Sequence, residues 1–461
     1  DGNGQFVVAA SETEAKDQYQ KQFGKAADSL TQDEDCLDTW FSSWLWPFEV
    51  FKGYSNPGNA DVSYYYPTQT LVTAPEIIFF WVARMIMAGF EFKQEKPFSE
   101  VYFTGIVRDK LGRKMSKSLG NSPDLLQLID HYGADACRFG IMISSPAGND
   151  LLWDESSNEQ GRNFNNKIWN ALKLTMLWKD RLEEVTPQDQ LAGSAFAISW
   201  FTHRLNEVKS ELDQQFKEFR LSEALKTIYS LIWDDFCSWY LEWVKPGQDQ
   251  KMNRKVHEKT LDFFEELMQL LHPFMPFVTE EIFHQLRPRK TGEDLVIKPL
   301  TAPVQADQET LQQGLLLKNC ISSIRDLRNK QQIKPKETIE LAVEPFDRKA
   351  YAAWSSLLCK QVNAAAFTFV TSAVPAALTT LVGKEKFYVG MQKTLDPAEQ
   401  KGALLKELDY HKGFLLSVEK KLSNERFVQQ AKPEVIALER KKKEDAEAKI
   451  RLIEESLRNL N

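Results

Sequence analysis

Two lysines and two serines lie within five residues of each other in the glycine-bracketed stretch RDKLGRKMSKSLGN. Lys114 and Lys117 are three residues apart, and Ser116 and Ser118 flank the second lysine. Ammonium groups neutralise negative charge that develops on phosphate oxygens, and hydroxyls and backbone N–H groups fill the remaining acceptor sites. We therefore predict that this loop binds a polyphosphate. The alternative is a solvated basic turn, which is what most lysine-rich loops are.

The segments around this loop alternate between strand-like and helix-like patterns. The long apolar run 76–90 predicts a buried helix, and helices are expected after Pro123 and from Asp135 to Ile143. Short apolar runs predict strands at 6–10, 70–73 and 101–107. Such alternation indicates an α/β domain with a parallel sheet.

The next segment, 159–290, consists of long runs with helical periodicity and almost no strand signal, which predicts an all-helical bundle. Two prolines interrupt it at 271–283, where Thr279 is expected to cap the helix that follows. Residues 305–395 return to mixed patterning and predict a small α/β domain. Its expected elements are a helix near 310–330, a strand at 338–344, a helix at 348–361 and a strand at 365–371.

The last segment carries two heptad patterns separated by about ten residues. The first is formed by Leu404, Leu408, His411, Leu415, Val418 and Leu422, and the second by Ala446, Ile450, Ile453, Leu457 and Leu460. Each run has only about three heptads, so pairing within the chain is favoured. We predict an antiparallel coiled-coil hairpin.

The composition excludes several classes of protein. The chain has 461 residues, a net charge of −7 and five widely spaced cysteines, so a disulfide scaffold or a cysteine-rich zinc site is not expected, and a reducing cytoplasm fits. The sequence contains no apolar run long enough to span a bilayer and no signal-peptide pattern at its start. It also begins without Met, so we expect a piece of a longer chain.

The charge is unevenly distributed along the chain. Residues 401–461 contain 14 Lys and Arg against 11 Asp and Glu, a net charge of +3, which leaves −10 on the residues before them. A basic tail on an acidic body indicates an arm that meets a polyanion, and a solvated helical face is the alternative.

The pentapeptide Lys114-Met115-Ser116-Lys117-Ser118 resembles the KMSKS motif of the class I aminoacyl-tRNA synthetases. In that family the loop closes over ATP and stabilises the pyrophosphate leaving group while the aminoacyl-adenylate forms. The resemblance implies that these five residues bind ATP as its Mg²⁺ complex, with Lys114 and Lys117 as the catalytic residues. No structural metal is expected.

Longer stretches resemble the valyl branch of this family. They are DEDCLDTWFSSWLWPF (33–48), LVTAPEIIFFWVARM (71–85), GRNFNNKIWNA (161–171), residues 271–283 and KLSNERFV (421–428). The resemblance runs from about residue 5 to the end of the chain and is weakest over 305–395.

The resemblance also implies roles for individual residues. Trp40, Ile77 and Trp81 would line a pocket for the valine side chain, whereas Trp44 and Trp46 could equally belong to an ordinary aromatic core. Apolar bulk suits that task because a pocket sized for valine excludes isoleucine.

Polar positions are implied for the two other substrates. Glu76, where the family usually has Asp, would bind the adenosine ribose of ATP; the Ala at 74 replaces the usual Gly. Asn163, Asn166 and Lys167 are expected to open the first bundle helix and contact tRNA, although helix capping or plain exposure to solvent would explain them at least as well.

The fold that the resemblance implies is multidomain, α/β plus all-α. Its parts are the second half of a Rossmann-like nucleotide-binding domain with the KMSKS loop (1–158), a helical anticodon-binding domain (159–304), a small α/β domain (305–399) and a coiled-coil tRNA-binding arm (400–461). The implied function is that of a cytoplasmic, monomeric valine–tRNA ligase that uses ATP, L-valine and tRNA(Val). The family's His-Ile-Gly-His motif and most of its editing insert are absent, so this chain is expected to bind tRNA but not to activate valine alone.

Three alternatives remain at this point. An isoleucyl-type enzyme is disfavoured by residues 38–48 and by a coiled coil where a cysteine-rich zinc module would be expected. A non-catalytic RNA-binding protein with a decayed synthetase domain is disfavoured by the intact loop 114–118. A coiled-coil interaction protein would be distinguished by deleting residues 400–461.

Overall fold

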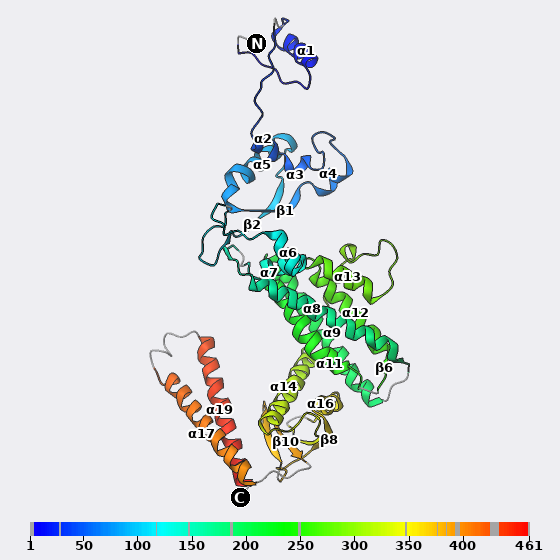
Figure 1. The fold of residues 1–461 in the computed structure, drawn as a ribbon, viewed down its shortest axis with the longest axis vertical. Coiled ribbons are helices and arrows are strands. Elements are labelled where there is room, and N and C mark those ends of the chain that lie inside the picture. Colours follow the sequence, from blue (N-terminus) through cyan, green and yellow to red (C-terminus); the bar gives the residue numbers. More distant parts are fainter. Residues whose placement is uncertain are drawn as a thin grey trace. The chain divides into compact units, whose positions relative to one another are not determined.

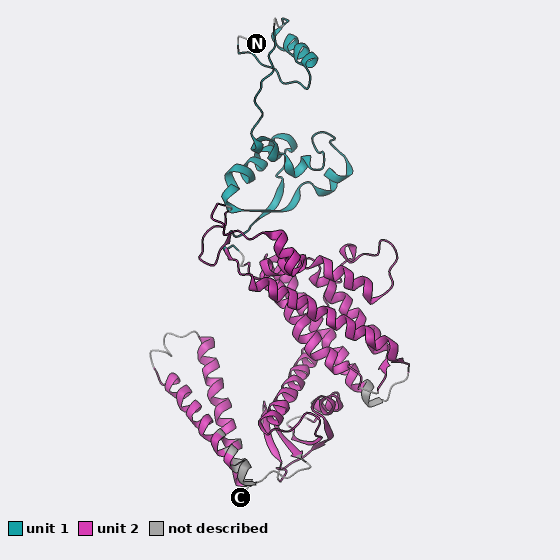
Figure 2. Cartoon of the chain, in the orientation of Figure 1, with its two compact units in different colours: residues 1–106, 148–150 teal, residues 107–147, 151–461 magenta. Residues whose placement is uncertain are grey.

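The computed structural model describes residues 4–26, 29–116, 118–145, 148–184, 188–247, 250–345, 348–375, 377–383, 385–391, 397–424 and 433–459. Within these ranges the chain divides into two compact units (Figure 2): residues 1–106 with 148–150, and residues 107–147 with 151–461. Among the described helices, none combines the length and the apolar character needed to cross a bilayer.

The first unit is built around a pair of parallel strands, β1 (Thr68–Thr73) and β2 (Phe98–Phe103), with Thr68 opposite Phe98 and Thr73 opposite Phe103. Its other elements are α1 (Glu12–Phe23), α2 (Thr39–Ser43), α3 (Trp46–Glu49), α4 (Ala60–Tyr65), the 3₁₀ turn η1 (Pro75–Ile77), the π-type turns η2 (Ile78–Val82) and η3 (Gly89–Lys93), and α5 (Ala83–Ala88). The helical connection between parallel strands is the expected crossover. Leu71, Val82, Met85 and Phe98 form its small core.

Two expectations for this unit are wrong. Residues 6–10 form no strand, and Phe6 and Val8 are 76% and 80% exposed, because an apolar run becomes a strand only where another strand pairs with it. The run 76–90 is helical but broken into short turns, and it is only partly buried: Phe79 and Met87 are 82% and 62% exposed. A run that is apolar at nearly every position has no continuous polar face, so its pattern cannot show how much of it is covered.

The expected strand 101–107 divides into the end of β2 and the start of the two-residue strand β3 (Val107–Arg108), which pairs with β4 (Leu151–Leu152) in the second unit. Between the two strands, a Cβ on Gly105 would lie 1.9 Å from the carbonyl oxygen of Asn149, so only glycine fits this close approach.

After β3, the second unit continues with α6 (Leu125–Tyr132) and α7 (Ala134–Ile143) into the helical bundle (Figure 1). The bundle elements are α8 (Ser156–Trp178), η4 (Lys179–Arg181), β5 (Leu182–Glu183), α9 (Gln188–Lys217), α10 (Leu221–Ser230), the π-helix η5 (Leu231–Tyr240), α11 (Leu241–Val244), β6 (Met252–Asn253), α12 (Arg254–Leu271), α13 (Pro276–Leu286) and η6 (Leu295–Ile297). Fully buried aromatic rings, among them Phe201, Phe236, Tyr240 and Phe263, fill its centre.

The cap expected at Thr279 is wrong. Helix α13 begins after Met275 with Pro276 in its first turn, where the ring fixes φ and no N–H is missed. Thr279 is buried one turn later, and its hydroxyl donates to the carbonyl of Met275 at 2.8 Å.

A four-stranded sheet follows the bundle, in the order β8-β7-β10-β9. Its elements are α14 (Gln308–Lys330), β7 (Ile339–Glu344), α15 (Lys349–Ala352), α16 (Ser355–Val362), β8 (Ala364–Phe369), β9 (Leu378–Val382) and β10 (Glu385–Met391). β7 and β8 are parallel, whereas β10 is antiparallel to both of its neighbours. The helices and first two strands lie close to their expected positions, but β9 and β10 were not expected.

The last two helices, α17 (Pro397–Leu422) and α19 (Pro433–Asn459), pack along each other. Leu408, Ile450 and Ile453 form a small buried cluster between them. Cross-helix ion pairs join Lys412 to Glu454 at 3.0 Å and Glu419 to Lys443 at 2.8 Å, so the two helices run antiparallel. Leu460 of the heptad pattern lies outside the described residues.

Candidate functional site

The loop that carries the two lysines leaves β3 through a tight turn. The N–H of Asp109 donates to the carbonyl of Arg113 at 2.9 Å, and the N–H of Gly112 donates back to the carbonyl of Asp109 at 2.8 Å. Gly112 has a φ of +77°, which side-chain-bearing residues rarely adopt. An isolated antiparallel β-bridge pairs the backbones of Arg108 and Lys114 and closes the turn, so Lys114 comes directly after it.

The base of this loop is held by Asp109 and Asn121. The Asn121 side-chain amide donates to Asp109 Oδ2 at 3.0 Å and to the carbonyl of Lys114 at 3.3 Å, while its oxygen accepts from the N–H of Ser116 at 2.9 Å. Asp109 also accepts from Arg113 Nε at 2.8 Å and from the N–H of Leu111 at 3.0 Å. The bond from Asn121 and the further bonds from Arg113 and Leu111 lower the pKa of Asp109 to about 2.

Sequence reasoning assigned no role to Asp109 or Asn121. The one available signal is that Asp109 stands three residues before Gly112, a common pairing at the ends of a type I turn. That spacing predicts a turn at Asp109. It does not predict the contact with Asn121, because the two residues come together only when the whole segment between them has folded.

The upper part of the loop presents hydroxyl groups and a cation. The Ser116 and Ser118 hydroxyls lie 3.1 Å apart, and Ser116 Oγ accepts from the N–H of Leu119 at 3.2 Å. Lys114 and Ser118 are exposed, whereas Met115 and Ser116 are half-buried. Lys117, the second predicted catalytic lysine, lies outside the described residues. The described groups suit phosphate oxygens, which accept hydrogen bonds from hydroxyls and ammonium groups.

A separate cavity of about 510 Å³ lies in the first unit, and two of the three residues expected to bind valine line it. Trp40 and Trp81 belong to its wall, and the Trp81 indole N–H donates to the carbonyl of Ser43 at 3.0 Å. Ile77 is half-buried in η1 and is not among the lining residues.

Trp46, which the sequence left open between the pocket and an ordinary core, also lines this cavity and is 52% exposed. Its ring centroid lies 5.6 Å from that of Trp81. The spacing of the tryptophans in the sequence cannot distinguish a residue that lines the cavity from one in a packed core, because the short helices α2 and α3 carry no clear periodicity.

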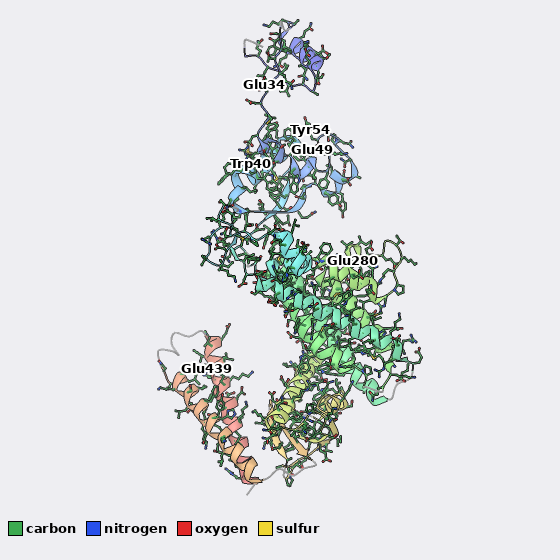
Figure 3. The ribbon with its side chains drawn as sticks, viewed as in Figure 1. Glu34, Trp40, Glu49, Tyr54, Glu280 and Glu439 are labelled. Atoms are coloured by element: carbon green, nitrogen blue, oxygen red, sulfur yellow. The ribbon has the colours of Figure 1, made fainter. Side chains whose placement is uncertain are left out.

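One carboxylate borders the same cavity. Glu49 accepts a hydrogen bond from the Ser55 hydroxyl at 2.7 Å and another from the N–H of Tyr54 at 2.8 Å, and these bonds lower the pKa of Glu49. Figure 3 shows Trp40, Glu49 and Tyr54 in the part of the chain that carries α2 and α3. Glu76 is exposed in η1. The cavity is therefore aromatic with one ionised carboxylate at its edge.

The three residues expected to contact tRNA lie on α8. The helix begins at Ser156, so they occupy its third and fourth turns and do not open it, which corrects that detail of the prediction. Asn163 and Asn166 are exposed, and the Lys167 ammonium lies 5.2 Å from the ring centroid of Trp233. A Cβ on Gly161 would lie 2.7 Å from the carbonyl oxygen of Ala136, so this glycine lets α8 pack closely on α7.

Helix α7, which follows the lysine loop and α6 in the sequence, is hydrogen-bonded to the start of α13 and to the residues just before it. Buried Asp135 accepts from the N–H groups of Phe277 and Val278 at 3.3 and 2.6 Å, and Arg138 donates to the carbonyls of Pro273 and Phe274 at 3.0 Å each. Burial raises the pKa of Asp135 despite these bonds.

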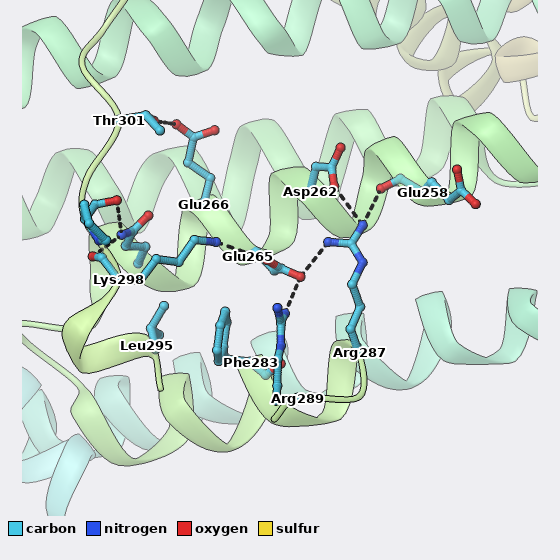
Figure 4. A network of polar contacts seen from close by, with 12 residues as sticks. Glu258, Asp262, Glu265, Glu266, Phe283, Arg287, Arg289, Leu295, Lys298 and Thr301 are labelled. Atoms are coloured by element: carbon cyan, nitrogen blue, oxygen red, sulfur yellow. Dashed lines mark hydrogen bonds and ion pairs between the residues drawn. The ribbon is translucent and has the colours of Figure 1, made fainter. Parts of the chain in front are cut away.

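A charge network around the buried Glu265 joins the chain after α13 to helix α12 (Figure 4). Glu265 accepts from Arg287 Nη1 at 2.6 Å, from Lys298 at 3.1 Å and from Arg289. Arg287 also donates to Asp262 at 2.7 Å. Burial alone would raise the pKa of Glu265, but the bonds from Arg289 and Lys298 and the charge of Arg287 outweigh it and lower the pKa.

Glu280, His284 and Asp294 form a group of three side chains whose ligand atoms could hold a metal ion. His284 Nε2 lies 3.3 Å from Glu280 and 3.2 Å from Asp294, distances that direct polar contacts between these side chains also produce. The absence of a structural metal stays a prediction.

Three protein-family models match the chain. Residues 3–154 match the model for class I tRNA synthetases of the I, L, M and V types, residues 199–343 match the anticodon-binding domain of tRNA ligases, and residues 396–461 match the tRNA-binding arm of valyl-tRNA synthetase.

Similar curated proteins carry the name valine–tRNA ligase. The proteins from Parabacteroides distasonis and Bacteroides fragilis are each 47% identical, over 98% and 99% of this chain and 52% of their own length. The protein from Chlorobaculum tepidum is 37% identical over 94% of this chain and 50% of its own length. The chain thus spans about half the length of the relatives it matches. It belongs to the valyl type of the class I aminoacyl-tRNA synthetases, as a C-terminal portion.

Proposed function

We propose that this chain is the tRNA-binding and pyrophosphate-stabilising part of a valine–tRNA ligase, which joins L-valine to tRNA(Val) through valyl-adenylate. The observation that carries this proposal is the loop Lys114–Ser118, anchored by Asp109 and Asn121, in a chain that is 47% identical to valine–tRNA ligases over nearly its full length.

The loop would act on the leaving group of the first step. A carboxylate oxygen of valine attacks the α-phosphorus of ATP, and the bond from that phosphorus to the oxygen bridging to the β-phosphate breaks. Negative charge accumulates on the departing pyrophosphate, where the Lys114 and Lys117 ammonium groups and the Ser116 and Ser118 hydroxyls would stabilise it. Mg²⁺ would arrive with ATP and neutralise phosphate charge. Pre-anchoring lowers the entropy lost when the loop closes.

The aromatic cavity would hold valine. Trp40 and Trp81 line it, and we add Trp46 to this set because it contacts Trp81. Ile77 and the ribose contact of Glu76 rest on the family resemblance alone.

The bundle and the paired helices α17 and α19 would bind tRNA(Val). Single-stranded loops of RNA are recognised through splayed bases, whereas basic arms contact phosphates. Asn163, Asn166 and Lys167 remain candidates because α8 presents the two asparagines to solvent. We further propose that the complete ligase is a cytoplasmic monomer, on the resemblance alone.

Calorimetric titration of Mg²⁺–pyrophosphate into the chain tests the loop. We expect weak binding that Lys114→Gln reduces about tenfold, the worth of one charge-assisted contact, with Lys110→Gln as a matched control outside the motif. We also expect no valine-dependent exchange of pyrophosphate into ATP by the chain alone. Equal affinity of the two variants would overturn this role, and robust exchange would contradict the expectation that the chain lacks part of the catalytic domain.

A further inference from the structure

Three side chains of types that bind transition metals meet where the segment after α13 returns to that helix. Glu280, which is labelled in Figure 3, and His284 lie four residues apart on α13, so they share one face of the helix. Asp294 directly precedes η6. One ligand atom from each of the three side chains lies within 4.8 Å of the other two.

The distances within this group match those of a tetrahedral metal site. Nitrogen and oxygen ligands at about 2.0 Å from a tetrahedral Zn²⁺ lie about 3.3 Å from each other. His284 Nε2 lies 3.3 Å from Glu280 Oε1 and 3.2 Å from Asp294 Oδ1. These atoms therefore already have the spacing of two edges of such a tetrahedron.

The ligands are held in place by contacts that need no metal. Glu280 accepts from the backbone N–H groups of Leu295 and Val296 at 2.7 and 3.2 Å, which fixes its carboxylate, as is usual for carboxylates that bind metals. On either side of Asp294, Arg289 and Lys298 are tied to α12 through Glu265. An ion at this site would therefore be exchangeable and not structural, in keeping with the expectation that the fold contains no structural metal.

The charge around the group favours a cation. Glu265 is neutralised by three Arg and Lys side chains, whereas within the described part of the chain no Lys or Arg forms an ion pair with Glu280 or Asp294. Their ion-pair partners there are imidazoles: His284, and His272 with its Nε2 3.9 Å from Glu280. Two carboxylates that lack a permanent positive partner attract a divalent ion strongly.

The group is also open to solvent. The side chains of Glu280, His284 and Asp294 are 28%, 38% and 47% exposed. An aqueous ion can reach them, and three protein ligands leave a fourth position for water.

We propose that Glu280, His284 and Asp294 form an exchangeable Zn²⁺ site that joins α13 to the segment before η6. The imidazole ligand selects a transition metal of the Zn²⁺ class over Mg²⁺, which prefers oxygen ligands alone. This site is independent of the valine–tRNA ligase function proposed above.

The test is a calorimetric titration of ZnCl₂ into the whole chain after a chelator has removed bound metal. His284→Ala removes the nitrogen ligand, and Asp294→Asn removes one carboxylate without a change of bulk. His131→Ala makes the same change as the first variant at an exposed position of α6 and serves as its control. Circular dichroism verifies that all three variants fold.

We expect the wild type and His131→Ala to bind one Zn²⁺ with equal affinity, and both site variants to bind it at least about tenfold more weakly. Excess Mg²⁺ should leave the zinc affinity unchanged. X-ray absorption of the zinc complex should show only nitrogen and oxygen neighbours, at about 2.0 Å.

Three results would overturn the site. Equal affinity of the wild type and both site variants, or a sulfur neighbour at about 2.3 Å, would place the ion elsewhere in the chain. No Zn²⁺ binding by the wild type would leave the three side chains joined by direct polar contacts alone. Displacement of Zn²⁺ by Mg²⁺ would refute the assignment to a transition metal.

Discussion

The side-chain amide of Asn121 donates a 3.0 Å hydrogen bond to the carboxylate of Asp109, twelve residues earlier in the chain. This contact closes the base of the loop that carries the lysine motif. The loop is therefore tethered at both ends by side chains that lie outside the motif, while the hydroxyls of Ser116 and Ser118 lie 3.1 Å apart within it.

Replacing Asn121 should loosen the loop without unfolding the protein. Asn121→Ala removes hydrogen bonds to Asp109, Lys114 and Ser116, each worth about 1 kcal/mol. We expect amide hydrogen exchange in peptides covering 109–121 to accelerate at least fivefold, with exchange in α7 unchanged. Asn149→Ala, in the other unit, is the control. Unchanged exchange in the loop would mean that this clamp is not what holds it.

The same clamp predicts an unusually acidic carboxyl group. The pKa of Asp109 is lowered to about 2 from the ordinary 3.8, chiefly by the bond from Asn121. Because the pKa of Asp109 is lower in the folded protein, the ionised carboxylate contributes fully to folding stability above pH 3.8. That contribution is lost as the pH falls through about 2. Carboxyl ¹³C NMR titration should give this low value in the wild type and a higher one in Asn121→Ala. An ordinary value in both proteins would contradict the clamp.

The charge network around the buried Glu265 should contribute strongly to stability. Glu265→Gln leaves Arg287, Arg289 and Lys298 without their shared carboxylate, and breaking a buried pair costs about 3 kcal/mol. Urea unfolding should show this loss in the free energy of unfolding. Glu258→Gln makes the same change on the exposed face of α12, where only the backbone carbonyl bonds Arg287, and should cost less than about 0.5 kcal/mol. Equal losses in the two variants would refute the network's role.

The paired helices α17 and α19 should depend on their buried seam. Ile450→Asp places an unpaired charge beside Leu408 and should lower the helical signal in far-UV circular dichroism, because burying a lone carboxylate is costly. Leu438→Asp, at a position of α19 that is 54% exposed, should retain the signal. Retention of the signal by both variants would mean that the pair does not depend on this seam.

Figure 3 places Glu439 on helix α19, where its carboxylate accepts a hydrogen bond from the Lys442 ammonium at 2.7 Å.

The sequence predicted those elements whose pattern is local. The bundle helices and α14 follow from a repeat of about 3.6 residues, and the lysine motif was identified from its spacing. Strands β9 and β10 were missed because the pairing of β10 with β7 and with β9 forms only in the fold and leaves no local pattern in the sequence. The strand expected at 6–10 was wrong for the converse reason, since an apolar run without a partner stays extended and exposed.

The candidate site was predicted in outline only. Trp40 and Trp81 were expected at the cavity and line it, whereas Trp46 could be assigned to it only from the structure. Asp109 and Asn121 look like ordinary turn residues in the sequence. Their role depends on a contact between the two ends of a closed loop, which no local pattern encodes.

A titration of this chain with tRNA(Val) and tRNA(Ile) transcripts over a range of salt concentrations tests the central claim most directly. The account predicts tighter binding of tRNA(Val), with an affinity that falls steeply as salt rises because phosphate contacts release counterions. Equal binding of both transcripts would contradict valine-specific recognition by this part of the protein, and no binding of either would contradict its role as the tRNA-binding portion.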